Sequence, residues 1–176
     1  MEFDNYKIAL LEAEQSEAFF NLIENNRVRL EDFFAGTVSK TRTLEETLQY
    51  CREIEQRIAD KTYFPFIIID TNTSKFVGLV DVKNIDWNIP KAELGSFIDK
   101  DYEGKGIVTK ATQLVIHTVV ETHRFKKLLC RANSRNLGSV SVILKNGFEL
   151  EGTIRRDYKT TKGEIVDLNY YGRIFD

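Results

Sequence analysis

The sequence predicts a mixed α/β fold in which one mostly antiparallel sheet is flanked by helices. Most of the strand-like segments follow one another with only short turns between them, which indicates antiparallel pairing. One later strand is instead reached across a helix, so we expect it to lie parallel to its neighbour. The 176 residues suffice for one substantial core, and we predict a single domain over residues 1–176.

The composition excludes several classes of protein. Hydrophobic residues make up 42% of the chain and charged residues 30%, as in a globular protein. The net charge is -2 with dispersed Lys and Arg, so we expect no nucleic-acid partner. No apolar run approaches the ~20 residues of a membrane span, and no secretory segment follows Met1. Cys51 and Cys130 lie in no Cys/His cluster, which predicts reduced core cysteines, no metal and a cytoplasmic location.

The amino-terminal part of the chain predicts a strand and helices. A strand over residues 6–11 is followed by an amphipathic helix that we expect to end near the Asn25-Asn26 pair. Residues 27–34 combine charges with aromatic side chains and predict a short helix or a loop.

The middle of the chain predicts one further helix and an antiparallel meander. Thr43 and Glu46 form a capping box at the start of a helix over residues 43–60. Three strands joined by turns follow it, over residues 64–69, 76–82 and 92–98.

The last of these strands leads into a turn that contains two glycines. Gly104 and Gly106 let the backbone bend and approach a ligand closely. The amides from Ile107 to Thr109 open the next helix, lack helical partners and point into the turn, where they attract an anion such as phosphate. The chain contains neither G-x-x-x-x-G-K-[ST] nor G-x-G-x-x-G, so we expect neither a nucleotide triphosphatase nor a dinucleotide enzyme.

The carboxyl-terminal part predicts two helices, one parallel strand and a hairpin. A helix over residues 106–122 leads to a strand over 127–132, and a helix over 137–146 is stopped by Gly147. Segments 148–155 and 165–174 then predict a closing hairpin. His117 and His123 have no partner at triad or ligand spacing and are predicted to be structural, and Trp87 is predicted to pack over a turn.

Five segments in this order resemble one known family. They are A-E-L-G-S-F-I-D (92–99), Y-E-G-K-G-I-V-T-K-A (102–111), N-L-G-S (136–139), N-G-F-E-L-E-G (146–152) and G-E-I-V-D-L-N-Y-Y (163–171). From Ile8 to Ile174 the chain resembles the GNAT superfamily of acetyl-CoA-dependent N-acetyltransferases, and within it the bacterial enzymes that acetylate the N-terminal amine of ribosomal proteins. The resemblance implies a sheet of about seven strands with a splayed parallel pair in its middle.

The resemblance implies that acetyl-CoA is the cosubstrate and that no metal takes part. The residues that it assigns to the cofactor are Phe97, Ile98 and Asp99 for pantetheine, Gly104, Lys105, Gly106, Ile107, Val108 and Thr109 for pyrophosphate, and Asn133, Asn136 and Ser139 beyond the parallel strand. Lys105 can equally be a solvated turn residue, and Asn136 can be the N-cap of the helix that starts at Leu137. Three acids, Asp99, Asp101 and Glu103, flank this site and should weaken anion binding slightly unless their side chains point to solvent. Asp101 stands where the superfamily usually carries Gln or Arg, and Glu103 stands where the ribosomal-protein group commonly carries Gln.

Three residues are candidates for the chemistry. In the N-x-x-S motif, the resemblance implies that Ser139 donates a hydrogen bond to the leaving thiolate, whereas Ile143 stands where other members of the superfamily carry a Tyr. Glu93 and Asp157 are the candidates for the base that takes a proton from the amine. Ser139 can instead be a helix-surface residue, and Glu93 a paired strand carboxylate.

The resemblance implies direct transfer of acetyl to a primary amine, with a protein N-terminus as the acceptor. We expect the acceptor to enter between residues 27–34 and the closing hairpin. Polyamines or aminoglycosides are alternative acceptors, for which a groove lined by several acids would be the sign. A non-catalytic acetyl-CoA-binding module that regulates a partner is a further alternative. The family also allows a homodimer.

Overall fold

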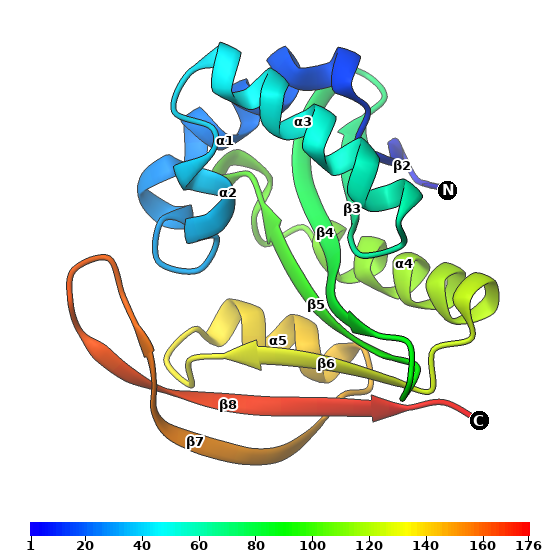
Figure 1. Ribbon diagram of the computed structural model, residues 1–176, viewed down its shortest axis with the longest axis vertical. Helices are drawn as coiled ribbons and strands as arrows, with labels where there is room; N and C mark the ends of the chain where they lie inside the picture. The colour runs from blue at the N-terminus through cyan, green and yellow to red at the C-terminus, as the bar shows by residue number, and fades with distance from the viewer.

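The computed structural model describes residues 1–176 and contains one eight-stranded sheet with helices on both faces (Figure 1). The strands lie in the spatial order β1-β2-β3-β4-β5-β6-β8-β7. Their bounds are β1 Glu2–Phe3, β2 Tyr6–Leu10, β3 Phe64–Asp70, β4 Lys75–Asp86, β5 Lys91–Ile98, β6 Lys127–Ala132, β7 Glu149–Lys159 and β8 Ile165–Ile174. The helices are η1 Ala13–Gln15, α1 Ser16–Leu30, α2 Ala35–Ser39, α3 Leu44–Ala59, η2 Lys100–Tyr102, α4 Ile107–His123 and α5 Leu137–Lys145.

Successive residues of β4 show how the two faces are covered. Leu79 packs in a core cluster with side chains of α1 and α3, such as Phe19 and Ile54. Its neighbour Val80 packs in a second cluster with side chains of α4, such as Val115. Because side chains alternate between the faces of a strand, α1 and α3 cover one face of the sheet and α4 covers the other.

The parallel pair in the middle of the sheet is splayed, as predicted. β5 pairs with β6 only from Lys91 opposite Lys127 to Leu94 opposite Cys130. Beyond Leu94, β5 stays paired with β4 as far as Ile98, while β6 stays paired with β8. The two strands therefore diverge toward their carboxyl ends (Figure 1).

The sheet has eight strands, in agreement with the expected number of about seven; the additional one is the short strand β1, which pairs with β2 in front of the predicted first strand. One prediction about a helix end needs correction. The helix α1 does not end near Asn25-Asn26 but continues to Leu30. Asn26 is buried, and its amide donates to the Leu22 carbonyl at 2.9 Å and to Asp99 Oδ2 at 2.7 Å. A satisfied Asn does not stop a helix.

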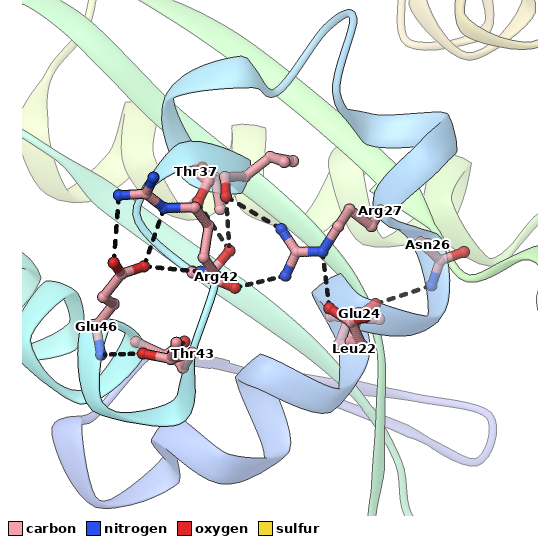
Figure 2. A network of polar contacts seen from close by, with 11 residues as sticks. Leu22, Glu24, Asn26, Arg27, Thr37, Arg42, Thr43 and Glu46 are labelled. Atoms are coloured by element: carbon pink, nitrogen blue, oxygen red, sulfur yellow. Dashed lines mark hydrogen bonds and ion pairs between the residues drawn. The ribbon is translucent and has the colours of Figure 1, made fainter.

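The corner from α1 to α3 is held by polar contacts (Figure 2). The Arg27 guanidinium donates to the carbonyl oxygens of Val38 at 3.2 Å and Thr41 at 2.5 Å. Thr43 caps α3 as predicted, since its hydroxyl accepts from the Glu46 amide at 3.1 Å. The reciprocal half of the predicted capping box is absent, because the Glu46 carboxylate accepts from the Arg42 amide instead.

The remaining elements agree with the sequence to within a few residues, apart from longer β4 and β7 strands and the unpredicted helices η1, α2 and η2. Gly147 follows α5 with φ +75°, the left-handed conformation expected of a helix-stopping glycine. Cys51 and Cys130 are free and buried, as predicted. None of the helices is both long and apolar enough to cross a lipid bilayer.

Candidate active site

A cleft of about 800 Å³ opens where β5 and β6 diverge. β5 lines it from Glu93 to Ile98, and two further groups of elements line it as well. One group, here called the helix side, belongs to the glycine turn, α4 and α5 and comprises Gly104, Gly106, Val108, Thr109, Thr112 and Ser139. The other group, here called the hairpin side, belongs to the segment after α1, β4, β6 and β7 and comprises Phe33, Phe34, Lys83, Arg131 and Tyr158.

The glycine turn has the geometry of an anion site. Gly104 and Gly106 have φ values of +73° and +74°, and a Cβ on either would meet no atom within 4 Å. The backbone of the turn is therefore left-handed and open toward the cleft. The first helical hydrogen bond of α4 runs from the Lys110 amide to the Gly106 carbonyl at 3.1 Å. The amides before Lys110 in this first turn have no helical acceptor and are available to an anion.

The acids beside this turn have partners within the protein. Asp99 is buried and accepts from the Asn26 amide and from the backbone amide of Asp101. Glu103 forms an ion pair with Arg29, which lines the cleft from the end of α1. Two of the three carboxylates that should weaken anion binding are thus engaged by other groups.

Other predicted residues of the helix side differ in where they lie. Asn136 caps α5, because its side chain accepts from the Ser139 amide at 3.1 Å, and it also lines the cleft. Asn133 instead accepts from the Arg135 amide and lies outside the cleft lining. The Lys105 ammonium donates to the Asp101 carbonyl at 2.9 Å and likewise does not line the cleft.

The hairpin side carries two ion pairs. The Glu93 carboxylate accepts from Arg131 Nε at 3.0 Å and from the Asn84 amide at 2.9 Å. Lys83 Nζ lies 3.3 Å from Oδ1 of the buried Asp81. The other oxygen of Asp81 accepts from the Tyr63 hydroxyl at 3.2 Å.

Asp157 is held away from the cleft lining. Its carboxylate accepts a hydrogen bond of 2.7 Å from the Tyr170 hydroxyl. Burial and this bond to Asp157 raise the pKa of Tyr170, so the phenol keeps its proton at neutral pH. Arg131 lies over the Tyr170 ring, 5.7 Å from its centroid. It therefore contacts both Glu93, its ion-pair partner, and the tyrosine that bonds to Asp157.

The tip of the closing hairpin reaches the segment after α1. Thr161 donates to Asp32 from its backbone amide at 2.9 Å and from its hydroxyl at 2.5 Å. These two bonds lower the pKa of Asp32. The rings of Phe33 and Tyr158 are stacked with centroids 6.4 Å apart. The two segments between which the acceptor is expected to enter thus meet at the cleft.

The structure brings most of the predicted site residues to one cleft. The lining includes Glu93, Phe97, Ile98, Gly104, Gly106, Val108, Thr109, Asn136 and Ser139, and it lacks Asp99, Lys105, Ile107, Asn133 and Asp157. Sequence reasoning missed Arg29, Lys83, Thr112, Arg131 and Tyr158. Lys83 and Arg131 alternate with apolar strand residues, and this alternation places each of them on the face of its strand opposite to those residues. That they share one cleft follows only when the register of β4 and β6 with β5 is known.

Cys130 and Thr112 lie on the cleft wall among apolar side chains. Burial, with a smaller effect from Glu93, raises the pKa of the Cys130 thiol, which is therefore a poor nucleophile at neutral pH. The Thr112 hydroxyl is buried and has no hydrogen-bond partner within the protein. A ligand in the cleft could supply the missing partner.

Comparison with known proteins agrees with this geometry. YdaF of Bacillus subtilis, provisionally named a ribosomal N-acetyltransferase, is 31% identical over 170 residues, covering 96% of this chain and 90% of its own. The ribosomal-protein-S5-alanine acetyltransferase of Vibrio fischeri superposes with a TM-score of 0.92 at 23% identity, covering 100% of this chain and 96% of its own. RimL, a ribosomal L7/L12 acetyltransferase solved with coenzyme A, superposes with a TM-score of 0.89 at 19% identity and covers 99% and 96% of the two chains.

The two solved structures establish the fold. The assignment to a family rests on the sequence model for the acetyltransferase (GNAT) domain, which matches residues 8–149 and therefore includes the splayed strands, the glycine turn and the Ser139 helix. The chain belongs to the GNAT family of acetyltransferases.

Proposed function

We propose that the protein transfers acetyl from acetyl-CoA to the N-terminal amine of a protein, with ribosomal proteins as the first acceptors to test. The observation that carries this proposal is the charge of the cleft. Two acids line it, Glu93 and Glu103, and each is paired with an arginine. The cations that line it are Arg29, Lys83, Arg131 and Lys145. A cleft with this balance of charge opposes binding of a polyamine or an aminoglycoside.

The helix side fits the phosphate and pantetheine parts of acetyl-CoA. The open glycine turn and the first amides of α4 would hold the pyrophosphate. The free edge of β5 beyond Leu94, including Phe97 and Ile98, would pair with the pantetheine amides as a further strand. Bound acetyl-CoA supplies a thioester whose carbonyl carbon accepts a nucleophile. Lys105, Asn133 and the Asp99 carboxylate do not line the cleft, so we assign them supporting roles at most.

The reaction is a direct displacement. The neutral amine nitrogen attacks the thioester carbon, a C–N bond forms, and the C–S bond breaks to release the thiolate. Ser139 lines the cleft at the first turn of α5, where its hydroxyl would donate a hydrogen bond to the developing thiolate. Glu93 and Asp157 stay the candidate bases, although each carboxylate already accepts hydrogen bonds from the protein.

The test is an acceptor panel with acetyl-CoA, read by thiol release and by the mass of each acceptor. We expect acetylation of a protein N-terminus and none of polyamines or aminoglycosides. Ser139→Ala should lower kcat about 10- to 100-fold with little change in acetyl-CoA affinity, because it removes a bond made to the leaving group. Ser134→Ala, in the exposed turn before α5, is the matched control.

Two outcomes would contradict the proposal. Acetylation of polyamines in preference to every protein N-terminus would move the protein to the class of small-amine acetyltransferases. Tight acetyl-CoA binding without transfer to any acceptor would favour a regulatory acetyl-CoA-binding module.

A further inference from the structure

We propose that Lys83, together with Arg131, makes the hairpin side a filter that admits the acceptor amine only in its neutral form. The filter would select the α-amine of a protein N-terminus over lysine side chains and polyamines. This inference rests on the proposed function and gives its acceptor site a physical basis.

The ion pairs of the hairpin side are oriented with the cation outward. The Lys83 side chain is 25% exposed, whereas its partner Asp81 is 4% exposed. The Arg131 side chain is 34% exposed, whereas its partner Glu93 is 13% exposed. An acceptor in the cleft therefore meets the positive end of each pair first. The Lys83 ammonium also lies over the ring of Phe34, 5.2 Å from its centroid, beside the segment that follows α1.

The groups around Lys83 supply no free negative charge. Asp81 is bound by Tyr63 as well as by Lys83, and Glu93, opposite Lys83 in the register, is bound by Arg131 and Asn84. Tyr158 approaches from β7, and burial together with the nearby carboxylate of Asp32 raises the pKa of its phenol, which keeps it neutral.

The more distant acids on the same side are engaged too. Asp32 accepts from Thr161, and Asp157 accepts from Tyr170. An ammonium ion entering the hairpin side would thus be repelled by Lys83 and Arg131 without a carboxylate that is free to bind it. A neighbouring positive charge favours the neutral form of an amine.

The two kinds of protein amine differ greatly in how often they are neutral. An α-amino group has a pKa of about 7.7 to 8.0 and a lysine side chain one of about 10.4. At pH 7.5 roughly a third of α-amines but only about one lysine in 800 lacks the proton, a difference of roughly 250-fold. A site that repels ammonium ions turns this difference into substrate selection.

The proton balance requires no free carboxylate. The first proton leaves the ammonium for solvent as the acceptor enters the cleft. The second leaves the nitrogen after the C–N bond has formed, and the departing thiolate accepts it, directly or through water, to give free CoA. Lys83 then acts on specificity through its charge, and it exchanges no proton with the substrate.

The test compares two peptides of matched sequence with the full-length enzyme. One peptide has a free N-terminus and no lysine, and the other has a blocked N-terminus and a single lysine near its start. We expect the wild-type enzyme to prefer the first by at least 100-fold in kcat/KM. Lys83→Gln should lower this preference about tenfold. It should also raise the apparent pKa of kcat for the α-amine peptide toward that of the free peptide, because kcat reports the ionisation of the bound amine, and a purely structural role would not produce this shift.

Further variants guard against misfolding and unspecific effects. Lys83→Gln leaves the buried Asp81 unpaired, so the double variant Asp81→Asn with Lys83→Gln removes both charges and should show the same loss of selectivity. Lys83→Arg keeps the charge and should retain the preference. Lys91→Gln removes a β5 lysine that pairs with Asp86 outside the cleft lining, and it should leave the preference unchanged.

The outcomes separate the two proposals. Unchanged selectivity in both the single and the double variant, with a wild-type preference for the α-amine, would overturn the filter and leave the proposed function standing. A wild-type preference for the lysine peptide would overturn both. Acetylation of neither peptide, while acetyl-CoA still binds, would refute the proposed function and the filter that depends on it.

Discussion

The two sides of the cleft differ in whether backbone groups or side chains supply their chemistry. On the helix side, the chemistry comes from the backbone of one short segment, in which two left-handed glycines expose the first amides of α4. On the hairpin side, it comes from charged and aromatic side chains that four distant parts of the chain bring together. The helix side therefore depends on backbone conformation, whereas the hairpin side depends on which side chains the fold brings together.

The role of side chains on the hairpin side can first be tested at Gly95, which lies in β5 beside the Asp81–Lys83 pair. A Cβ there would lie 2.5 Å from Asp81 Oδ1 and 2.7 Å from Lys83 Nζ. Gly95→Ala should displace the buried Asp81 and lower the free energy of unfolding by about 2 to 4 kcal/mol, measured by urea denaturation.

The matched control for Gly95 is Gly152→Ala in β7. A Cβ at Gly152 would meet nothing within 4 Å, so the change in unfolding free energy should be within about 0.5 kcal/mol. Equal losses in the two variants would show that strand geometry, rather than the Asp81–Lys83 pair, requires the glycine at position 95.

A smaller effect is expected from the glycine turn, and it should fall on affinity. Replacing both Gly104 and Gly106 by Ala places side chains where φ is +73° and +74°, a conformation that costs about 1 to 2 kcal/mol per residue. Relaxation of the turn away from this conformation would withdraw the exposed amides. We expect acetyl-CoA binding to weaken about 10- to 100-fold by calorimetry, with the preference between acceptor peptides unchanged.

The control for the turn is Gly36→Ala in α2, where φ is not positive and a Cβ would meet nothing within 4 Å. Its acetyl-CoA affinity should equal that of the wild type. A glycine-turn variant that altered the preference between acceptor peptides as strongly as the affinity for acetyl-CoA would contradict the proposal that the helix side binds acetyl-CoA and the hairpin side selects the acceptor.

The sequence predicts the helix side better than the hairpin side, because one short segment forms the former and several distant segments form the latter. A glycine turn before a helix is a local pattern, so Gly104, Gly106 and the start of α4 follow from neighbouring residues alone. Lys83 and Arg131 face one cleft only because β4, β5 and β6 pair in a particular register. Register depends on contacts between distant segments, which a single sequence does not display.

Asn26 shows the same limit within a helix. Read locally, the Asn25-Asn26 pair indicates a helix end, since Asn competes with helical hydrogen bonding. In the fold, the Asn26 side chain joins α1 to Asp99 and accepts from the Lys100 amide at 3.1 Å, just ahead of the glycine turn. The partner lies 73 residues away, and it changes the residue from a helix stop into a link between α1 and the segment that leads into the glycine turn.

The smallest predicted effect concerns His123, which lies outside the cleft lining. A variant at this position therefore distinguishes pH effects on stability from those on catalysis. Its ring stacks on Phe64 with centroids 4.6 Å apart and meets Trp87 edge-on; Trp87 in turn donates to the Lys61 carbonyl. Burial, aided by the charge of Lys61, lowers the pKa of His123 below its ordinary value of 6.5. The unfolded chain therefore takes up this proton more readily than the folded protein does.

The sign of the pH dependence follows from that difference. The stability contributed by neutral His123 is fully present above pH 6.5 and is lost as the pH falls below it. His123→Gln should reduce the loss of unfolding free energy between pH 7.5 and pH 5.5. The reduction should be less than about 1 kcal/mol, because the ring is only half-buried and water screens its charge. The exposed His117, changed to Gln, should leave that slope as it is. If His123→Gln also moved the apparent pKa of kcat, the pH dependence of catalysis would reflect the fold as a whole, and the charge of Lys83 would no longer be needed to explain it.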